Sequence, residues 1–178
     1  MIIAKAHYQD QAAWNIMSSA LADLLNNLES EPVFICIGSD HHLLDCLGPL
    51  TGTMLAAVAP KLAVYGTLDH PLHAQNLVRE MRQIKNYNTG KIEIAIDASV
   101  GDEDEIGIVQ LRQGSLLPGK ALAKSLPPVG NYSITGIVDV RFNSQRARTK
   151  HPGLGHVYHM AKLMSELIGD WYQAQHQV

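Results

Sequence analysis

The sequence predicts an α/β protein, a three-layer αβα sandwich whose open sheet is mostly parallel with a mixed edge. Three short apolar runs, at residues 32–38, 61–66 and 92–97, have the continuous hydrophobicity of strands that are covered on both faces. Helical patterns at residues 47–59 and 71–86 separate these runs. The alternation β-α-β-α-β is typical of a parallel sheet with helices on both faces.

The segments that begin and close this unit contain further helix signals. Residues 11–29 predict an amphipathic helix, because apolar side chains such as Met17, Leu21 and Leu25 recur at helical spacing. Pro71 suits the first turn of the helix after the second strand, since a helix leaves the N–H of that position unbonded.

The second half of the sequence follows a different pattern. Residues 106–114 and 132–140 read as strands, but the segment between them is too rich in proline and glycine for a crossover helix. We therefore expect a long ordered loop and a mixed edge of the sheet. A last helix is expected at residues 154–174. The basic stretch before it is interpreted as a solvated loop, with contact to an acidic partner as the alternative; its cations are Arg141, Arg146, Arg148 and Lys150.

Composition restricts the function classes. A chain of 178 residues suits one domain over 1–178. Hydrophobic residues at 46%, charged residues at 17% and a net charge of −3 argue against disorder and against nucleic-acid binding. No stretch reaches the ~20 apolar residues of a membrane span. The apolar N-terminal patch is too short for a signal peptide, so the cytoplasm is expected.

Reactive side chains concentrate after the first predicted strand. They are Asp40, His41, His42, Asp45 and Cys46. In open α/β sheets, ligands bind beyond the carboxyl ends of the strands. The loop therefore lies where a site is expected.

The next two strands deliver polar groups to the same edge. Asp69, His70 and His73 follow the second strand, and the third strand ends in Asp97. Taken singly, Asp97 suits a turn and Asp45 suits a helix N-cap. Taken together, two close carboxylates cannot both ionise cheaply, so either one keeps its proton or a cation lies between them. An aspartate acid–base pair and a metal site both remain open.

Several motifs resemble known families. The segments "LLDCLGPL" (43–50), "YGT" (65–67), "IAIDAS" (94–99), "GSLLPGKAL" (114–122) and "SITGIVDV" (133–140) resemble the bacterial spore germination proteases in order and spacing. The segments "GTLDHPLHAQNL" (66–77) and "LPPVGNYSITGIV" (126–138) are more similar still to a family of small sporulation proteins. The resemblance spans residues 33–140.

This resemblance implies the phosphorylase/hydrolase-like fold, which hydrogenase maturation proteases share, and an atypical aspartic peptidase. By motif, the essential aspartates fall on Asp45 and Asp97. The substrate-binding residues are expected in a facing wall and a flap-like rim; they are Gly66 and Thr67 in the wall, and Leu117, Pro118 and Gly119 in the rim. The "HHLLDC" loop departs from the germination proteases, so their zymogen control and spore-protein substrate do not carry over.

Three functional interpretations remain. The first is a sporulation or germination peptidase that needs no cofactor and acts on a protein or peptide. The second is a hydrolase that resembles the maturation proteases and binds a divalent metal through Asp45, Asp97 and His70. The third is a non-catalytic sporulation binding factor. None involves nucleic acid or a membrane, and each leaves a homo-oligomer open.

The remaining cysteines and histidines are interpreted structurally. Cys36 lies in an apolar strand and is expected to be a buried, reduced thiol. Cys46 is disfavoured as a nucleophile, because the neighbouring Asp45 charge would raise the pKa of its thiol. His156 and His159 are expected to be surface histidines of the last helix.

Overall fold

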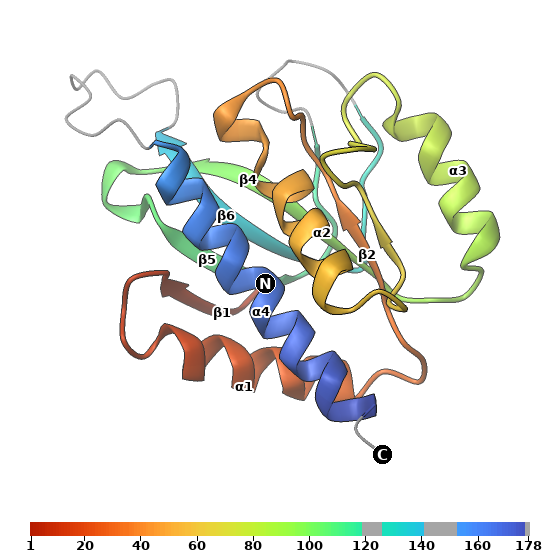
Figure 1. The fold of residues 1–178 in the computed structure, drawn as a ribbon, viewed down its shortest axis with the longest axis horizontal. Coiled ribbons are helices and arrows are strands. Elements are labelled where there is room, and N and C mark those ends of the chain that lie inside the picture. The colour runs from red at the N-terminus through yellow and green to blue at the C-terminus, as the bar shows by residue number, and fades with distance from the viewer. Residues whose placement is uncertain (119–125, 141–152, 177–178) are drawn as a thin grey trace.

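A computed structural model describes residues 1–118, 126–140 and 153–176 (Figure 1). Its elements, in chain order, are β1 (Ile2–His7), α1 (Ala13–Asn26), β2 (Val33–Cys36), η1 (Leu43–Asp45), α2 (Leu47–Val58), β3 (Val64–Tyr65), α3 (Leu77–Tyr87), β4 (Glu93–Gly101), η2 (Glu103–Glu105), β5 (Ile108–Gln113), β6 (Tyr132–Val140) and α4 (Leu154–His176). The helices predicted at residues 11–29, 47–59 and 154–174 are confirmed as α1, α2 and α4.

The six strands form one mixed sheet with the order β1-β5-β6-β4-β2-β3. Strands β6, β4, β2 and β3 pair in parallel, whereas β5 runs antiparallel to both of its neighbours. The expectation of a mostly parallel sheet is therefore wrong. The difference comes mainly from β1, a strand that the sequence did not predict because most of its residues are exposed or half-buried.

The helices lie on both faces of the sheet. Phe34 and Cys36 of β2 belong to the core cluster that α1, α2 and α4 share. In Figure 1, α2 and α4 cross in front of the sheet, and α1 lies below β1. Val33 and Ile35 of β2 belong to a second cluster with α3. This alternation explains why the strand reads as continuously apolar: each face packs against helices.

Two elements have different bounds from those expected. β4 continues past Asp97 to Gly101, because its parallel pairing with β6 continues to Val140. The helix expected from Pro71 begins only at Leu77. The residues before it are held by other bonds: Leu72 forms a parallel bridge with Ile37, and the His73 N–H donates to the side chain of Asn76 at 2.9 Å.

α2 packs against the sheet through glycine. A Cβ at Gly52 would collide with the Gly66 carbonyl oxygen and lie 3.1 Å from Cys36 Cβ, and one at Gly48 would collide with the Ile37 carbonyl. Gly66 has φ +90°, and a side chain there would collide with the Cys36 carbonyl. The helix therefore lies at backbone distance from β2 and from the end of β3.

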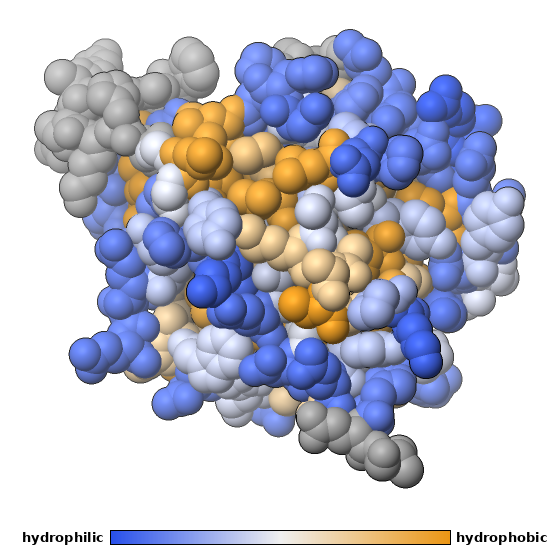
Figure 2. All heavy atoms as spheres, in the orientation of Figure 1, coloured by the Kyte–Doolittle hydropathy of each residue, from blue (hydrophilic) through white to orange (hydrophobic). Residues whose placement is uncertain are grey.

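The outer side of α2 is also apolar. The helix contains no charged residue, and Figure 2 shows hydrophobic side chains gathered over it. Val58 at its end is exposed. Within the described ranges, none of the helices combines the length and the apolar character that crossing a bilayer requires.

Replacing Gly52 by Ala tests the close packing of α2. We expect a loss of about 2 kcal/mol of stability, because the added methyl meets backbone that cannot move aside cheaply. This loss exceeds the gain of up to about 1 kcal/mol that alanine brings within a helix. Thermal unfolding should show a midpoint lower by about 5 °C.

The matched control is Gly155→Ala in α4, where nothing lies within 4 Å of the new Cβ. Its midpoint should equal or exceed that of wild type. A Gly52→Ala protein as stable as wild type would show that α2 is not held by this contact.

Candidate active site

The candidate site lies where β2 ends and β4 continues. The Ile37 N–H donates to the Ile96 carbonyl at 2.7 Å, and the next residue, Gly38, turns away to donate to Leu72 at 2.8 Å. The chain leaves β2 toward β3 on one side, whereas it leaves β4 toward β5 on the other. Neighbouring parallel strands whose connections diverge in this way form the usual ligand crevice of an α/β sheet.

The loop after β2 holds Asp45 at this crevice. The Ser39 N–H donates to the Asp45 carbonyl at 3.0 Å, and the Asp45 N–H donates to His42 at 2.9 Å. Gly38 has φ +147°, and a Cβ there would collide with the Asp45 carbonyl. Short backbone bonds therefore fix Asp45 in the 3-10 turn η1, which contacts β4.

Asp45 acts electrostatically on Asp97. Burial raises the pKa of Asp97 well above the ordinary value of 3.8, and the Asp45 charge raises it further. The Ala98 N–H, which donates to Asp97 Oδ1 at 2.7 Å, opposes this shift. The two carboxyls that the sequence placed at neighbouring strand ends are therefore close enough for the charge of Asp45 to affect Asp97.

Asp45 has a different electrostatic environment. Burial raises its pKa, but the charge of His42, the Ser39 N–H and the charge of His73 all lower it. Among the described residues, no histidine is found to act on Asp97 in this way. Both pKa values are raised, that of Asp97 more strongly, so Asp45 is the carboxyl that ionises more readily.

The loop histidines divide into two groups. His42 and His73 act on Asp45, whereas His41 is exposed and lies 3.7 Å from Asp40. His70 is also exposed and lies in a turn in which its N–H donates to Thr67 Oγ1 at 3.2 Å. His73 rather than His70 is therefore the histidine of the segment after β3 whose charge acts on Asp45.

The metal interpretation requires Asp45, Asp97 and His70 to lie together. No three His, Cys, Asp or Glu side chains of the described residues are grouped so that they could hold an ion. Asp45 and Asp97 provide carboxylate oxygens, but His70 is held in its own turn.

The predicted facing wall lines a different hollow. Gly66, Thr67 and His70 line a pocket of about 270 Å³ between β3 and α3, together with apolar groups such as Leu72 and Ile84. The Thr67 hydroxyl oxygen already accepts a hydrogen bond from the His70 N–H. Gly66 has a structural role in addition, because only a residue without a side chain fits against Cys36.

The predicted rim is described in part. Leu117 is 50% exposed and Pro118 is buried, while Gly119 lies outside the described residues. The preceding Leu116 pairs with Val129 in an antiparallel bridge. The basic residues Arg141, Arg146, Arg148 and Lys150 also lie outside the described part of the chain.

The cysteines show no sign of reactivity. Cys36 is buried and free, and burial raises its pKa. Burial and the Asp45 charge raise the pKa of Cys46, whose thiol donates to the Leu43 carbonyl at 3.0 Å. His159 is exposed, as expected, but His156 is half-buried and its ring centroid lies 5.1 Å from that of Tyr8.

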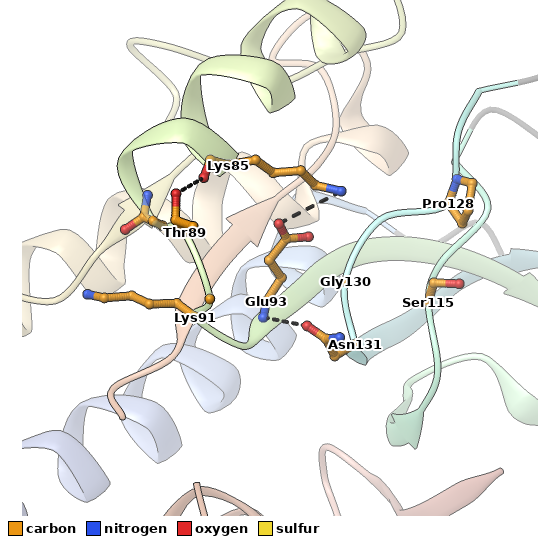
Figure 3. A pocket seen from close by; sticks show the side chains of 10 residues that line it. Lys85, Thr89, Lys91, Glu93, Ser115, Pro128, Gly130 and Asn131 are labelled. Carbon is orange, nitrogen blue, oxygen red and sulfur yellow. Dashed lines mark hydrogen bonds and ion pairs between the residues drawn. The ribbon is translucent and has the colours of Figure 1, made fainter. Parts of the chain in front are cut away.

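A second hollow of about 490 Å³ lies at the opposite edge of the sheet, where β4 and β6 begin (Figure 3). Lys85 pairs with Glu93 at 4.0 Å, and the Glu93 N–H donates to Asn131 Oδ1 at 2.9 Å. These contacts join the end of α3 to β4 and β6. The hollow is therefore separate from the two aspartates.

Sequence reasoning missed one neighbour of Asp97. Thr135 of β6 lies directly beside Asp97 in the sheet register. The available signal was the polar–apolar alternation of "SIT" within a strand that is otherwise apolar. This alternation places the hydroxyls of Ser133 and Thr135 on one face.

Replacing Asp97 by Asn should raise the thermal midpoint near neutral pH. Because the folded-state pKa of Asp97 lies above 3.8, the native state binds this proton more tightly than the unfolded state. Wild type therefore loses stability as pH rises from the unfolded-state pKa of Asp97 to its folded-state pKa. Asparagine does not titrate, so the higher stability of the variant should be present at about pH 7 and vanish at about pH 3. Thermal unfolding at both pH values provides the measurement.

Asp40→Asn is the control, because it removes an exposed carboxyl from the same loop. Its midpoint should follow that of wild type at both pH values. A destabilised Asp97→Asn protein at neutral pH would contradict the electrostatic interpretation.

Comparison with known proteins shows the family. Residues 5–167, which include both aspartates, match the model of a family described as "Protein of unknown function (DUF1256)". The chain is 34% identical over 161 residues to the "Uncharacterized protein YyaC" of Bacillus subtilis (strain 168), an alignment that covers 89% of this chain and 78% of that protein. With a match over nearly its whole length, the chain belongs to the DUF1256 family.

Proposed function

We propose that this protein is a peptidase of the atypical aspartic type, with Asp45 and Asp97 as its catalytic residues. One observation carries the proposal: the charge of Asp45, on the loop after β2, raises the pKa of Asp97 on β4, which burial also raises. A pair of titratable groups whose environments separate their pKa values is the usual arrangement for acid–base catalysis.

The environments assign the two roles. Asp45, whose ionised form is favoured by His42, His73 and the Ser39 N–H, is the general base that takes a proton from the attacking water. Asp97, whose pKa burial and the Asp45 charge raise, is the general acid that protonates the leaving amine. The proton taken by Asp45 and the one given by Asp97 balance over one cleavage.

The motif resemblance supports the same reaction. The segments at residues 43–50 and 94–99 that resemble the germination proteases contain Asp45 and Asp97. We extend the proposal to the phosphorylase/hydrolase-like three-layer fold, to a protein or peptide substrate, and to the cytoplasm of a spore-forming cell. The helices on both faces of the sheet are compatible with that fold.

Cleavage of unstructured proteins tests the mechanism. Wild type, Asp45→Asn and Asp97→Asn are incubated with unstructured proteins, including small acid-soluble spore proteins, and products are identified by mass spectrometry. Each variant should lose at least about 10²-fold in rate, because each lacks half of the acid–base pair. Asp40→Asn, the exposed neighbour on the loop, should cleave as wild type does.

Three outcomes contradict the proposal. Cleavage that survives in either site variant excludes the aspartate mechanism. Cleavage that a chelator abolishes favours a metal-dependent hydrolase. If no sample cleaves, a non-catalytic sporulation binding factor becomes the better interpretation.

A further inference from the structure

A row of polar side chains crosses the sheet at the level of Asp97. In the register of the sheet, Asp97 of β4 lies beside Thr135 of β6, and Thr135 lies opposite Gln110 of β5. Paired residues of neighbouring strands direct their side chains to the same face. The three side chains therefore follow one another across three strands.

Alternation along the strands identifies this face. Ile94 and Ile96 pack in the cluster with α1, α2 and α4, whereas Ala95 packs in the cluster with α3. Asp97, two residues after Ala95, therefore faces the α3 side of the sheet. The apolar neighbours of Thr135, Ile134 and Gly136, face the other side: Ile134 lies in the cluster of α4, and a Cβ at Gly136 would meet Leu47 and Met160.

Thr135 presents a hydroxyl on a strand that is otherwise mostly apolar. The residue is 5% exposed. Its Oγ1 is not among the fully buried polar atoms of the described residues that lack a partner. Valine would suit a central strand equally well. The position therefore does not need a hydroxyl for packing, and the hydroxyl is available to a group at the aspartate site.

Gln110 determines which group can donate a hydrogen bond along this row. Its side chain is buried, with 7% exposure, and its Oε1 accepts a hydrogen bond from Arg112 Nη1 at 3.2 Å. A guanidinium only donates, so this contact assigns the amide oxygen and leaves the NH₂ group as the donor beside Thr135. A hydroxyl that accepts from Gln110 has its own proton free to donate toward Asp97.

We propose that Thr135 is a positioning residue of the aspartate site, and that its hydroxyl donates to the Asp97 carboxyl through one bridging water. Asp97 Oδ1 already accepts from Ala98, so a second donor would fix the orientation of the whole carboxyl group. The inference rests on the proposed function for its catalytic meaning, but the hydrogen bond itself does not.

The hydrogen bond would also adjust the acid strength of Asp97. Burial and the Asp45 charge both favour its protonated form. A donated hydrogen bond stabilises the carboxylate and opposes these two effects. An acid that is too weak transfers its proton poorly, so Thr135 would keep Asp97 able to give up its proton and regain it in each cycle.

Carboxyl-resolved NMR titration of Asp97 in wild type and three variants tests the proposal. Thr135→Val, which keeps the shape but removes the donor, should raise the pKa of Asp97 by about half a unit or more. Thr135→Ser, which keeps the hydroxyl, should restore the wild-type titration. Circular dichroism and thermal unfolding of each variant check that the fold is retained, and Thr135→Val should be at least as stable as wild type.

Ser133→Ala is the matched control. Ser133 is a buried hydroxyl on the same strand and the same face, but it lies beside Ala95 instead of Asp97. Its removal should leave the Asp97 titration unchanged. An unchanged titration in Thr135→Val, or an equal shift in Ser133→Ala, would overturn the proposal.

Kinetics separate this proposal from the proposed function. If wild type cleaves an unstructured protein, Thr135→Val should lower kcat by about tenfold with little change in KM, and Thr135→Ser should retain activity. If wild type cleaves nothing, the peptidase proposal fails, while the titration still decides whether Thr135 bonds to Asp97.

Discussion

The backbone contact between α2 and β2 is the constraint on which the rest of the structure depends. Gly48 and Gly52 leave no room for a side-chain carbon between the helix and the strand, and Gly66 leaves none between the end of β3 and Cys36. The helix must therefore begin directly over the end of β2. The loop that joins the two has only residues 37–46 in which to turn back, so its backbone bonds to itself and places Asp45 at the rim of the sheet.

The position of Asp97 at the edge of the sheet follows from the unequal lengths of neighbouring strands. β2 ends at Cys36, whereas β4 remains paired with β6 as far as Gly101. Asp97 is the first residue of β4 beyond the last backbone bond from β2, so β2 no longer flanks it. A strand that is paired on one side and free on the other holds a carboxyl firmly while leaving space for a reacting group. The loop from β2 then supplies the second carboxyl.

The two aspartates differ through their surroundings and not through their chemistry. Histidines from two separate loops act on Asp45, and only a backbone N–H opposes the burial of Asp97. The polar row through Thr135 and Gln110 lies on the α3 side of the sheet, whereas the other face of the same strands packs as an ordinary apolar core. At the level of Asp97 the fold thus packs an apolar core against one face of β4, β6 and β5 and places a row of polar groups on the α3 side.

The sequence by itself determined the order of the central elements and the two aspartates after neighbouring strands. These features follow from hydrophobic periodicity and from motifs, which are local properties of the chain. It did not reveal that β1 joins the sheet, that β4 passes Asp97, or that Thr135 lies beside it, because strand pairing and register depend on residues far apart in the chain. The sequence also favoured His70 over His73, because both histidines follow the same strand. Only the folded structure shows that His70 lies in the turn closed by Thr67, whereas the charge of His73 acts on Asp45. Local patterns identify the residues that carry the chemistry, but long-range pairing decides which of them meet.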